Sequence, residues 1–297
     1  MYLIIGATGY LGSYLITNVL SNTKANIIAT YNSNFPNKTD DRIKWEKLNL
    51  EDFNSIDIFF NNIKGHSNLK VIFLSSYHHP DKVEENPKLA WHVNVGALDY
   101  FLNKSKNLIS TLFYASSDSV YGESINNYVF NEKDLCSPLN TYGRTKFIAE
   151  QVVLLYNFNV IRYSFLIGPS IIKKEHFYDY ILKTLKNNAN IHMFSDSYRN
   201  PIDFNSAAYY TVNLCERYPN IKKEIINIAG DKSLSKYDVA MLIAKNNQLR
   251  TKNIKKISIT DKENIKFFQT KRAQSTLISN KKLKKLLNIN TIELKGM

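Results

Sequence analysis

Residues 1–12 read Met-Tyr-Leu-Ile-Ile-Gly-Ala-Thr-Gly-Tyr-Leu-Gly, so a short apolar run leads directly into Gly6, Gly9 and Gly12. The apolar spacing of Ser13–Leu20 is typical of a helix, and the whole segment predicts a strand, a glycine turn and a helix. Glycines at this spacing let the backbone approach a pyrophosphate held at the helix N-terminus. Spaced glycines also occur by chance, but their position directly after a strand favours dinucleotide binding over a purely structural turn. We expect the cofactor to contact residues of this turn: Gly6, Thr8, Gly9, Tyr10, Leu11 and Gly12.

The chain as far as Gly168-Pro169 alternates between apolar runs and helical segments. The runs at 27–31, 71–74, 111–115 and 160–163 predict buried strands, and 52–63, 87–106 and 141–157 predict helices. Such alternation predicts an α/β protein with a doubly wound parallel sheet, the Rossmann fold.

Beyond Gly168-Pro169 the alternation is lost, and the sequence predicts helices at 177–186, 235–245 and 281–287 with one strand at 224–229. We expect a dinucleotide-binding Rossmann domain at residues 1–168, with a returning segment at about 200–230. A smaller mixed α/β substrate-binding lobe is expected at 169–199 and 231–297.

The composition is that of an ordinary globular protein, with 44% apolar and 22% charged residues in 297, which excludes a disordered chain. Lys and Arg (39) exceed Asp and Glu (26), giving a formal charge of +13. Most of the lysines are dispersed, and the dense group Lys281, Lys282, Lys284 and Lys285 is interpreted as a solvated helix face. We therefore expect no nucleic-acid partner.

Two cysteines, Cys136 and Cys215, are too few for a disulfide framework and indicate a reducing compartment. The uncharged segment Tyr2–Thr23 is interrupted by glycine, serine and threonine and has no basic leader, so it is not interpreted as a signal peptide or membrane span. A cytoplasmic protein without a membrane partner is expected.

The end of the second predicted strand bears on the choice of cofactor. NAD-binding folds have an acidic residue there for the adenosine 2′-hydroxyl, but Thr30–Ser33 contains no carboxylate and Lys38 lies nearby. This pattern favours NADP(H) over NAD(H). At this and the next strand end we expect further cofactor contacts: Tyr31, Asn32, Ser75, Ser76 and Tyr77.

Tyr142-Gly-Arg-Thr-Lys146 places a phenol and an ammonium four residues apart on one face of a predicted helix. A fixed positive charge beside the phenol would lower its pKa from about 10 and suit it to acid catalysis. Ser117, in Ser116-Ser-Asp-Ser-Val-Tyr-Gly122, follows the 111–115 strand at the carboxyl edge of the sheet, where ligands of such folds bind.

With these motifs the sequence resembles the extended short-chain dehydrogenase/reductase superfamily of the NAD-dependent epimerase/dehydratase type, over nearly the whole chain. Within it, Pro138–Glu150, Ile226–Gly230, Ser235–Asp238 and Lys271–Leu277 are most similar to dTDP-4-dehydrorhamnose reductases. The resemblance implies a catalytic set of Ser117, Tyr142, Lys146 and Asn94. Of these, Tyr142 and Lys146 would also bind the cofactor. It implies that the substrate, a nucleotide-diphosphate sugar, contacts Ser117, Asp118, Tyr142, Arg199 and Arg272.

Two departures leave the substrate sugar open. Val120-Tyr121-Gly122 has the form more usual in epimerases, and Ala273 stands where a proline would follow the arginine. The first hypothesis is NADPH-dependent reduction of the 4-keto group of a nucleotide-activated 6-deoxy sugar. The alternatives are an NAD-dependent nucleotide-sugar 4-epimerase and a catalytically silent dinucleotide-binding regulatory protein. A homodimer remains possible in each case.

His78-His79 is the one histidine pair, and it is not interpreted as a metal site, because adjacent histidines rarely reach one ion and no cysteine or acidic partner is evident. One of the two could instead contact substrate or cofactor. A 4,6-dehydratase is disfavoured, since those enzymes carry Glu where Ser119 stands.

Overall fold

The computed structural model describes residues 1–33, 40–105, 107–261, 263 and 268–295. Its centre is a seven-stranded sheet in the order β12-β7-β5-β4-β1-β2-β3, in which every pair of neighbours is parallel. The strands are β1 (Tyr2–Ile5), β2 (Ile27–Tyr31), β3 (Ile43–Lys47), β4 (Leu69–Phe73), β5 (Ile109–Ser117), β7 (Asn159–Tyr163) and β12 (Ile225–Ile228). The predicted doubly wound parallel sheet is confirmed. The edge strand β3 was not predicted, because Ile-Lys-Trp-Glu-Lys lacks the apolar run of a central strand.

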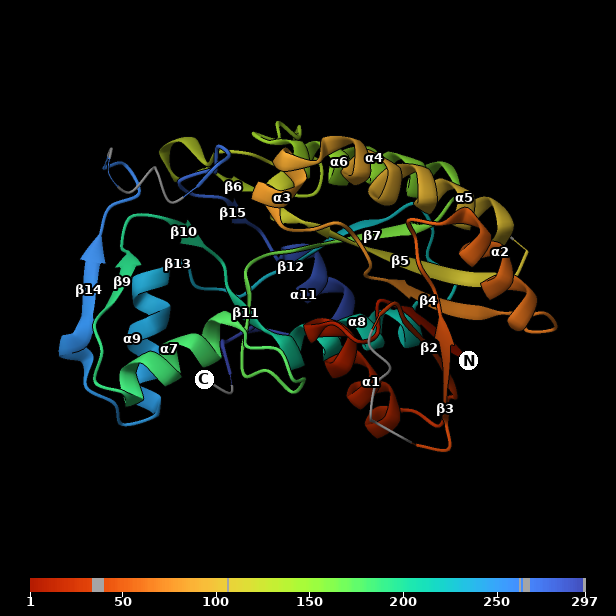
Figure 1. Cartoon of the computed structure of the whole chain (residues 1–297), viewed down its shortest axis with the longest axis horizontal. Coiled ribbons are helices and arrows are strands. Elements are labelled where there is room, and N and C mark those ends of the chain that lie inside the picture. The colour runs from red at the N-terminus through yellow and green to blue at the C-terminus, as the bar shows by residue number, and fades with distance from the viewer. Residues whose placement is uncertain (34–39, 106, 262, 264–267, 296–297) are drawn as a thin grey trace.

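Helices cover both faces of this sheet (Figure 1). One face carries α1 (Tyr10–Asn22), α8 (Phe204–Arg217) and α11 (Lys281–Leu287), and the other carries α2 (Phe53–Asn62), α5 (Ala97–Ser105) and α6 (Thr141–Leu155). Strand alternation divides β1 between the two layers: Tyr2 and Ile4 belong to the apolar cluster under α1, and Leu3 and Ile5 to the cluster under α2 and α5. Burial on both faces explains why the inner strands are mainly apolar.

The helix expected at 87–106 is interrupted. It consists of α4 (Pro87–Trp91), a π-helical turn η1 (His92–Gly96) and α5, with the N–H of Ala97 donating to the carbonyl of His92. A π-turn inserts one residue into the helical ladder and is frequent at functional sites. Asn94 lies in this turn. The short helix α3 (Pro80–Glu85) before it was not predicted.

In the part of the chain that the structure describes, smaller sheets and the helices α7 (Phe177–Lys186) and α9 (Lys236–Asn246) form a second lobe (Figure 1). These helices pack through Ile181, Leu185 and Ile243, and the predicted N-cap Ser235 forms a capping box with Asp238. The paired strands are β9 (Ile191–Phe194) with β14 (Ile254–Ile257), β10 (Tyr198–Arg199) with β13 (Leu234–Ser235), β11 (Ile202–Asp203) with β8 (Leu166–Ile167), and β15 (Leu277–Ile278) with β6 (Val129–Phe130). Single helical turns occur at η2 (Asp118–Val120), η3 (Ile125–Asn127) and η4 (Thr251–Asn253).

The predicted lysine-rich helix is α11, but the interpretation of its lysines as a fully solvated face is wrong. Lys282 Nζ lies 2.5 Å from a carboxylate oxygen of Glu224, just before β12, and Lys284 Nζ lies 2.7 Å from Asp231. These two side chains fasten the helix to the sheet edge, whereas Lys281 and Lys285 are exposed. In the described part of the chain, no helix is long and apolar enough to cross a membrane.

Candidate functional site

The glycine turn between β1 and α1 requires its glycines. Gly6 has φ +84°, and a Cβ on Gly12 would lie 2.5 Å from the carbonyl oxygen of Gly6. The N–H of Gly6 donates to Thr30 Oγ1 at 2.9 Å, so β2 supports the turn from the side. Gly9 caps α1 without a side-chain hydrogen bond, and the first turn of α1 contains no acidic residue. The turn therefore fits the pyrophosphate of a dinucleotide, which would meet a helix N-terminus without repulsion.

Tyr10, predicted to contact the cofactor, also joins α1 to the second lobe. Its hydroxyl donates to the carbonyl of Glu175 at 2.7 Å, and its ring lies 4.7 Å from the ring of His176. Tyr14, one turn later, donates to the carbonyl of Pro169 at 2.9 Å. The beginning of α1 thus lies beneath the first segment of the second lobe.

The end of β2 contains no carboxylate within Thr30–Ser33. Thr30 is buried, and its hydroxyl accepts the hydrogen bond from Gly6 of the glycine turn. Tyr31 is half-buried, and Asn32 is exposed. Lys38, which the sequence argument also used, lies outside the described residues.

Asn94 fastens the segment after β4. Its side-chain oxygen accepts from the N–H of Tyr77 at 2.7 Å, and its amide nitrogen donates to the carbonyl of Tyr77 and to Thr145 Oγ1, both at 3.1 Å. Ser75 approaches the glycine turn so closely that a Cβ on Gly6 would lie 2.6 Å from its Oγ. In this structure Asn94 therefore positions the predicted cofactor segment 75–77 against α6.

Ser117, Asp118 and Tyr142 come together at the carboxyl end of β5. Ser117 Oγ donates to a carboxylate oxygen of Asp118 at 3.1 Å and accepts from the N–H of Ser119 at 3.2 Å. Tyr142 lies in the first turn of α6, whose N-cap Asn140 accepts from the N–H of Gly143 at 2.9 Å. Burial raises the pKa of Tyr142 to about 12; the Asp118 carboxylate adds to this, and a hydrogen bond with Ser117 opposes it.

Lys146 is buried, 2% exposed, and its ammonium is directed at the sheet. Its Nζ donates to the carbonyl of Ala115 at 2.5 Å and lies 4.2 Å from the ring centroid of Tyr114. Burial lowers the pKa of Lys146 to about 7, which the Glu150 carboxylate opposes. The expectation that Lys146 lowers the pKa of the Tyr142 phenol is wrong for this structure. The ammonium serves the backbone of β5, and burial dominates at the phenol.

Glu150, one helical turn after Lys146, was missed by the sequence reasoning. It accepts from Arg162 Nε at 2.9 Å and Arg162 Nη2 at 2.6 Å, and from Ser116 Oγ at 2.5 Å. Both ionic side chains are at most 2% exposed, and Arg162 lies 4.6 Å from the ring of Tyr121. This buried two-point pair fixes α6 to β5 and β7, and the continued four-residue spacing Tyr142, Lys146, Glu150 could have revealed it.

Arg199 and Arg272, predicted to bind substrate, lie in the second lobe and reach carboxylates of the Rossmann fold. Arg199 Nε is 3.8 Å from a carboxylate oxygen of Asp118, and its other nitrogens donate to backbone carbonyls. Arg272 Nη2 donates to Asp81 at 2.8 Å. Nearby, Asn140 Nδ2 donates to the carbonyl of Lys271 at 2.9 Å. The structure thus brings both arginines to the side of the Ser117 and Tyr142 pair.

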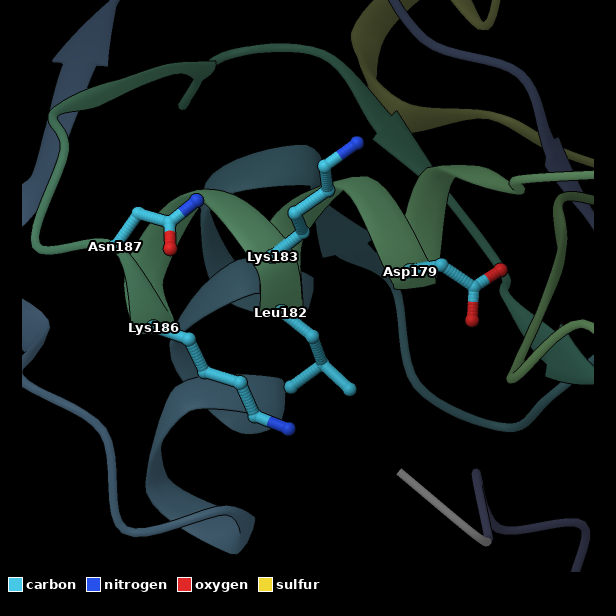
Figure 2. Close-up of a pocket in the computed structure, with 5 residues that line it drawn as sticks. All are labelled: Asp179, Leu182, Lys183, Lys186 and Asn187. Carbon is cyan, nitrogen blue, oxygen red and sulfur yellow. The ribbon is translucent and has the colours of Figure 1, made fainter.

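Other candidate positions are less informative. A shallow hollow beside α7 is lined by Asp179, Leu182, Lys183, Lys186 and Asn187, which come from one helix and the residue after it and include no predicted site residue (Figure 2). Within the described ranges, no group of three His, Cys, Asp or Glu side chains could hold a metal ion.

A parallel sheet with a glycine turn between its first strand and the following helix is typical of dinucleotide-binding Rossmann proteins. The model of one family, the RmlD substrate binding domain, matches residues 1–295, and the chain belongs to this family.

Among similar proteins, the Methionine adenosyltransferase 2 subunit beta of Mus musculus is 28% identical over 278 residues, 92% of this chain and 79% of that protein. A structure of a hypothetical dTDP-4-dehydrorhamnose reductase from Sulfolobus tokodaii superposes with a TM-score of 0.80 at 24% identity, covering 99% of this chain and 97% of the other. A UDP-glucuronic acid 4-epimerase from Bacillus cereus, in complex with UDP-glucuronic acid and NAD, gives a TM-score of 0.80 at 18% identity, covering 98% and 94%.

Proposed function

We propose that this protein is an NADPH-dependent reductase that acts on the 4-keto group of a nucleotide-activated 6-deoxy sugar. The observation that carries the proposal is the pairing of Ser117 with Tyr142 at the carboxyl end of β5, one helical turn from the buried Lys146. A hydroxyl and a phenol held together beside a dinucleotide turn can donate two hydrogen bonds to one carbonyl oxygen.

The bound cofactor would supply the hydride to the carbonyl carbon, and the glycine turn and the segment 75–77 would hold it. Tyr142 then donates its hydroxyl proton to the oxygen of the former carbonyl, and Ser117 donates a hydrogen bond to the same oxygen. A phenol pKa of about 12 suits this direction of reaction, because the group is fully protonated at neutral pH. Lys146 holds the Ala115 carbonyl at the end of β5 and so keeps the strand end in place.

The missing carboxylate at Thr30–Ser33 supports NADPH as the cofactor. Arg199 and Arg272 support an anionic substrate, since guanidinium groups match phosphate oxygens in two-point geometry. The similarity to a dTDP-4-dehydrorhamnose reductase fold supports a nucleotide sugar as the ligand class.

The proposal is tested by mixing the purified protein with NADPH and a dTDP-activated 4-keto-6-deoxyhexose and following the loss of NADPH absorbance. Consumption that requires the keto sugar is expected. UDP-, GDP- and CDP-activated counterparts identify the base, and a free keto sugar without a nucleotide is the control. No consumption with any activated sugar would refute the reductase.

A second candidate is a dinucleotide-binding subunit of another enzyme, favoured by the similarity to a methionine adenosyltransferase subunit over 92% of this chain. In that case NADPH would bind without turnover, and the protein would co-purify with a catalytic partner. A third candidate, a 4-epimerase with permanently bound NAD, is favoured by Val120-Tyr121-Gly122. It would interconvert nucleotide sugars without net consumption of cofactor.

A further inference from the structure

Lys236, the first residue of α9, has an unusual environment in the second lobe. Its Nζ lies 5.7 Å from the ring centroids of Phe177 and Phe194 and 5.9 Å from that of Phe268. These distances are at the outer limit of about 6 Å for a cation–π contact, so the three rings stabilise the ammonium only weakly. Within the described part of the chain, no hydrogen bond or ion pair to this ammonium is found.

Among the described residues, the charged groups that act on Lys236 are cations. The guanidinium of Arg272 lies 4.7 Å from the same Phe268 ring. Burial, followed by Arg272 and Arg199, lowers the pKa of Lys236 to about 8, and no carboxylate of the described residues is among the causes. Arg199 and Arg272, by contrast, face Asp118 and Asp81.

A desolvated cation without a counterion is unfavourable in a folded chain. Neutralising it requires an anion that can also contact neighbouring cations. A compact ammonium with three donors can contact several oxygens of one phosphate group. The site thus favours a ligand with more than one negative charge.

Lys236, Arg199 and Arg272 form a cation group in the second lobe. Its position relative to the predicted active site indicates which anion fits. Asp118 adjoins Ser117 and acts on the phenol of Tyr142, and Arg199 contacts Asp118 from the second lobe. Arg272 lies over the same Phe268 ring as Lys236, and both arginines act on the Lys236 ammonium. A ligand whose keto group meets Tyr142 and whose charged end meets Arg199 and Arg272 would therefore lie near Lys236.

We propose that Lys236 binds the diphosphate of the nucleotide sugar, together with Arg199 and Arg272, as the cation of the three that has no carboxylate partner among the described residues. The inference rests on the proposed function and adds a binding residue to which the sequence analysis assigned no role.

The test compares wild type with Lys236→Met, Lys236→Arg and Lys245→Met, the last an exposed lysine on the same helix. Each protein is saturated with NADPH, so that the glycine turn is occupied, and titrated calorimetrically with pyrophosphate, dTDP, UDP, GDP and CDP. We expect Lys236→Met to weaken the tightest diphosphate at least about tenfold, or roughly 1.4 kcal/mol, with Lys236→Arg retaining most of the affinity. Lys245→Met should bind as wild type does.

Thermal unfolding without added diphosphate separates a binding role from a structural one. Removal of a half-buried ammonium that pairs with no described carboxylate should leave the Tm of Lys236→Met unchanged or higher. A lower Tm together with normal diphosphate affinity would overturn the proposal, as would a wild type that binds none of the five probes. The reductase proposal fails separately, if diphosphates bind through Lys236 but no activated keto sugar consumes NADPH.

Discussion

The charged side chains at the end of β5 and those of the cation group in the second lobe find their partners in different parts of the molecule. Lys146 finds its partner locally, in the Ala115 carbonyl of the strand on which α6 packs. Arg199 and Arg272 instead reach from the second lobe to Asp118 and Asp81 of the Rossmann fold. Lys146 is thus held by neighbouring elements of the Rossmann fold, whereas the positions of the two arginines depend on how the lobe packs against the sheet.

The largest effect is expected at the local site. Tyr142→Phe removes only the proton donor, so turnover should fall below roughly a tenth of wild type while NADPH affinity stays within a few fold. Steady-state kinetics and cofactor fluorescence measure the two. Tyr128→Phe, a change at an exposed tyrosine bonded to Asp134, is the matched control and should be active. Higher residual activity would mean that Tyr142 is not the acid.

Lys146→Ala should reduce both turnover and cofactor affinity, each by about tenfold or more, because it leaves the Ala115 carbonyl without its donor and a cavity beside Tyr114. The same two assays measure it, with the exposed Lys88→Ala as the control. Loss of turnover with unchanged NADPH affinity would mean that Lys146 acts only on the Tyr142 phenol and has no role in cofactor binding.

At the cation group, Arg199→Ala or Arg272→Ala should raise the KM for the sugar nucleotide at least roughly tenfold, about 1.4 kcal/mol, with little change in NADPH affinity. The exposed Arg250→Ala is the control. Normal KM values in both variants would show that the second lobe does not bind the diphosphate there. Retention of duplex DNA by the wild type at physiological salt would also contradict the assignment of the second lobe to a nucleotide sugar, because dispersed lysines would then explain the +13 charge.

The smallest effect concerns the cofactor. NADPH should bind about fivefold or more tightly than NADH, roughly 1 kcal/mol, because Thr30–Ser33 offers no carboxylate to repel the 2′-phosphate. Fluorescence titration of the two cofactors decides it. Equal or tighter NADH binding would mean that Tyr31 and Asn32 accommodate the 2′-hydroxyl without an acid.

The same contrast explains what could be predicted from the sequence. The strand, turn and helix at residues 1–22 follow from local spacing. The pairing of Ser117 with Tyr142 was expected from the family that their motifs resemble. The partners of Arg199 and Arg272 could not be predicted, because they join segments distant in sequence. The Glu150–Arg162 pair was missed, although Glu150 continues the four-residue spacing of Tyr142 and Lys146. Burial also reversed one expectation: desolvation raises the pKa of Tyr142, although a lysine lies one turn away.

The most direct test of the reductase assignment is hydride transfer itself. NADPH deuterated at the transferable position of C4 of the nicotinamide is incubated with the activated 4-keto sugar that consumes it, and the product is analysed by mass spectrometry and NMR. The account predicts one deuterium on C4 of the sugar in equal amount to the oxidised cofactor, with none formed by Tyr142→Phe. Oxidised cofactor without deuterium on C4, or equal transfer by Tyr142→Phe, would contradict it.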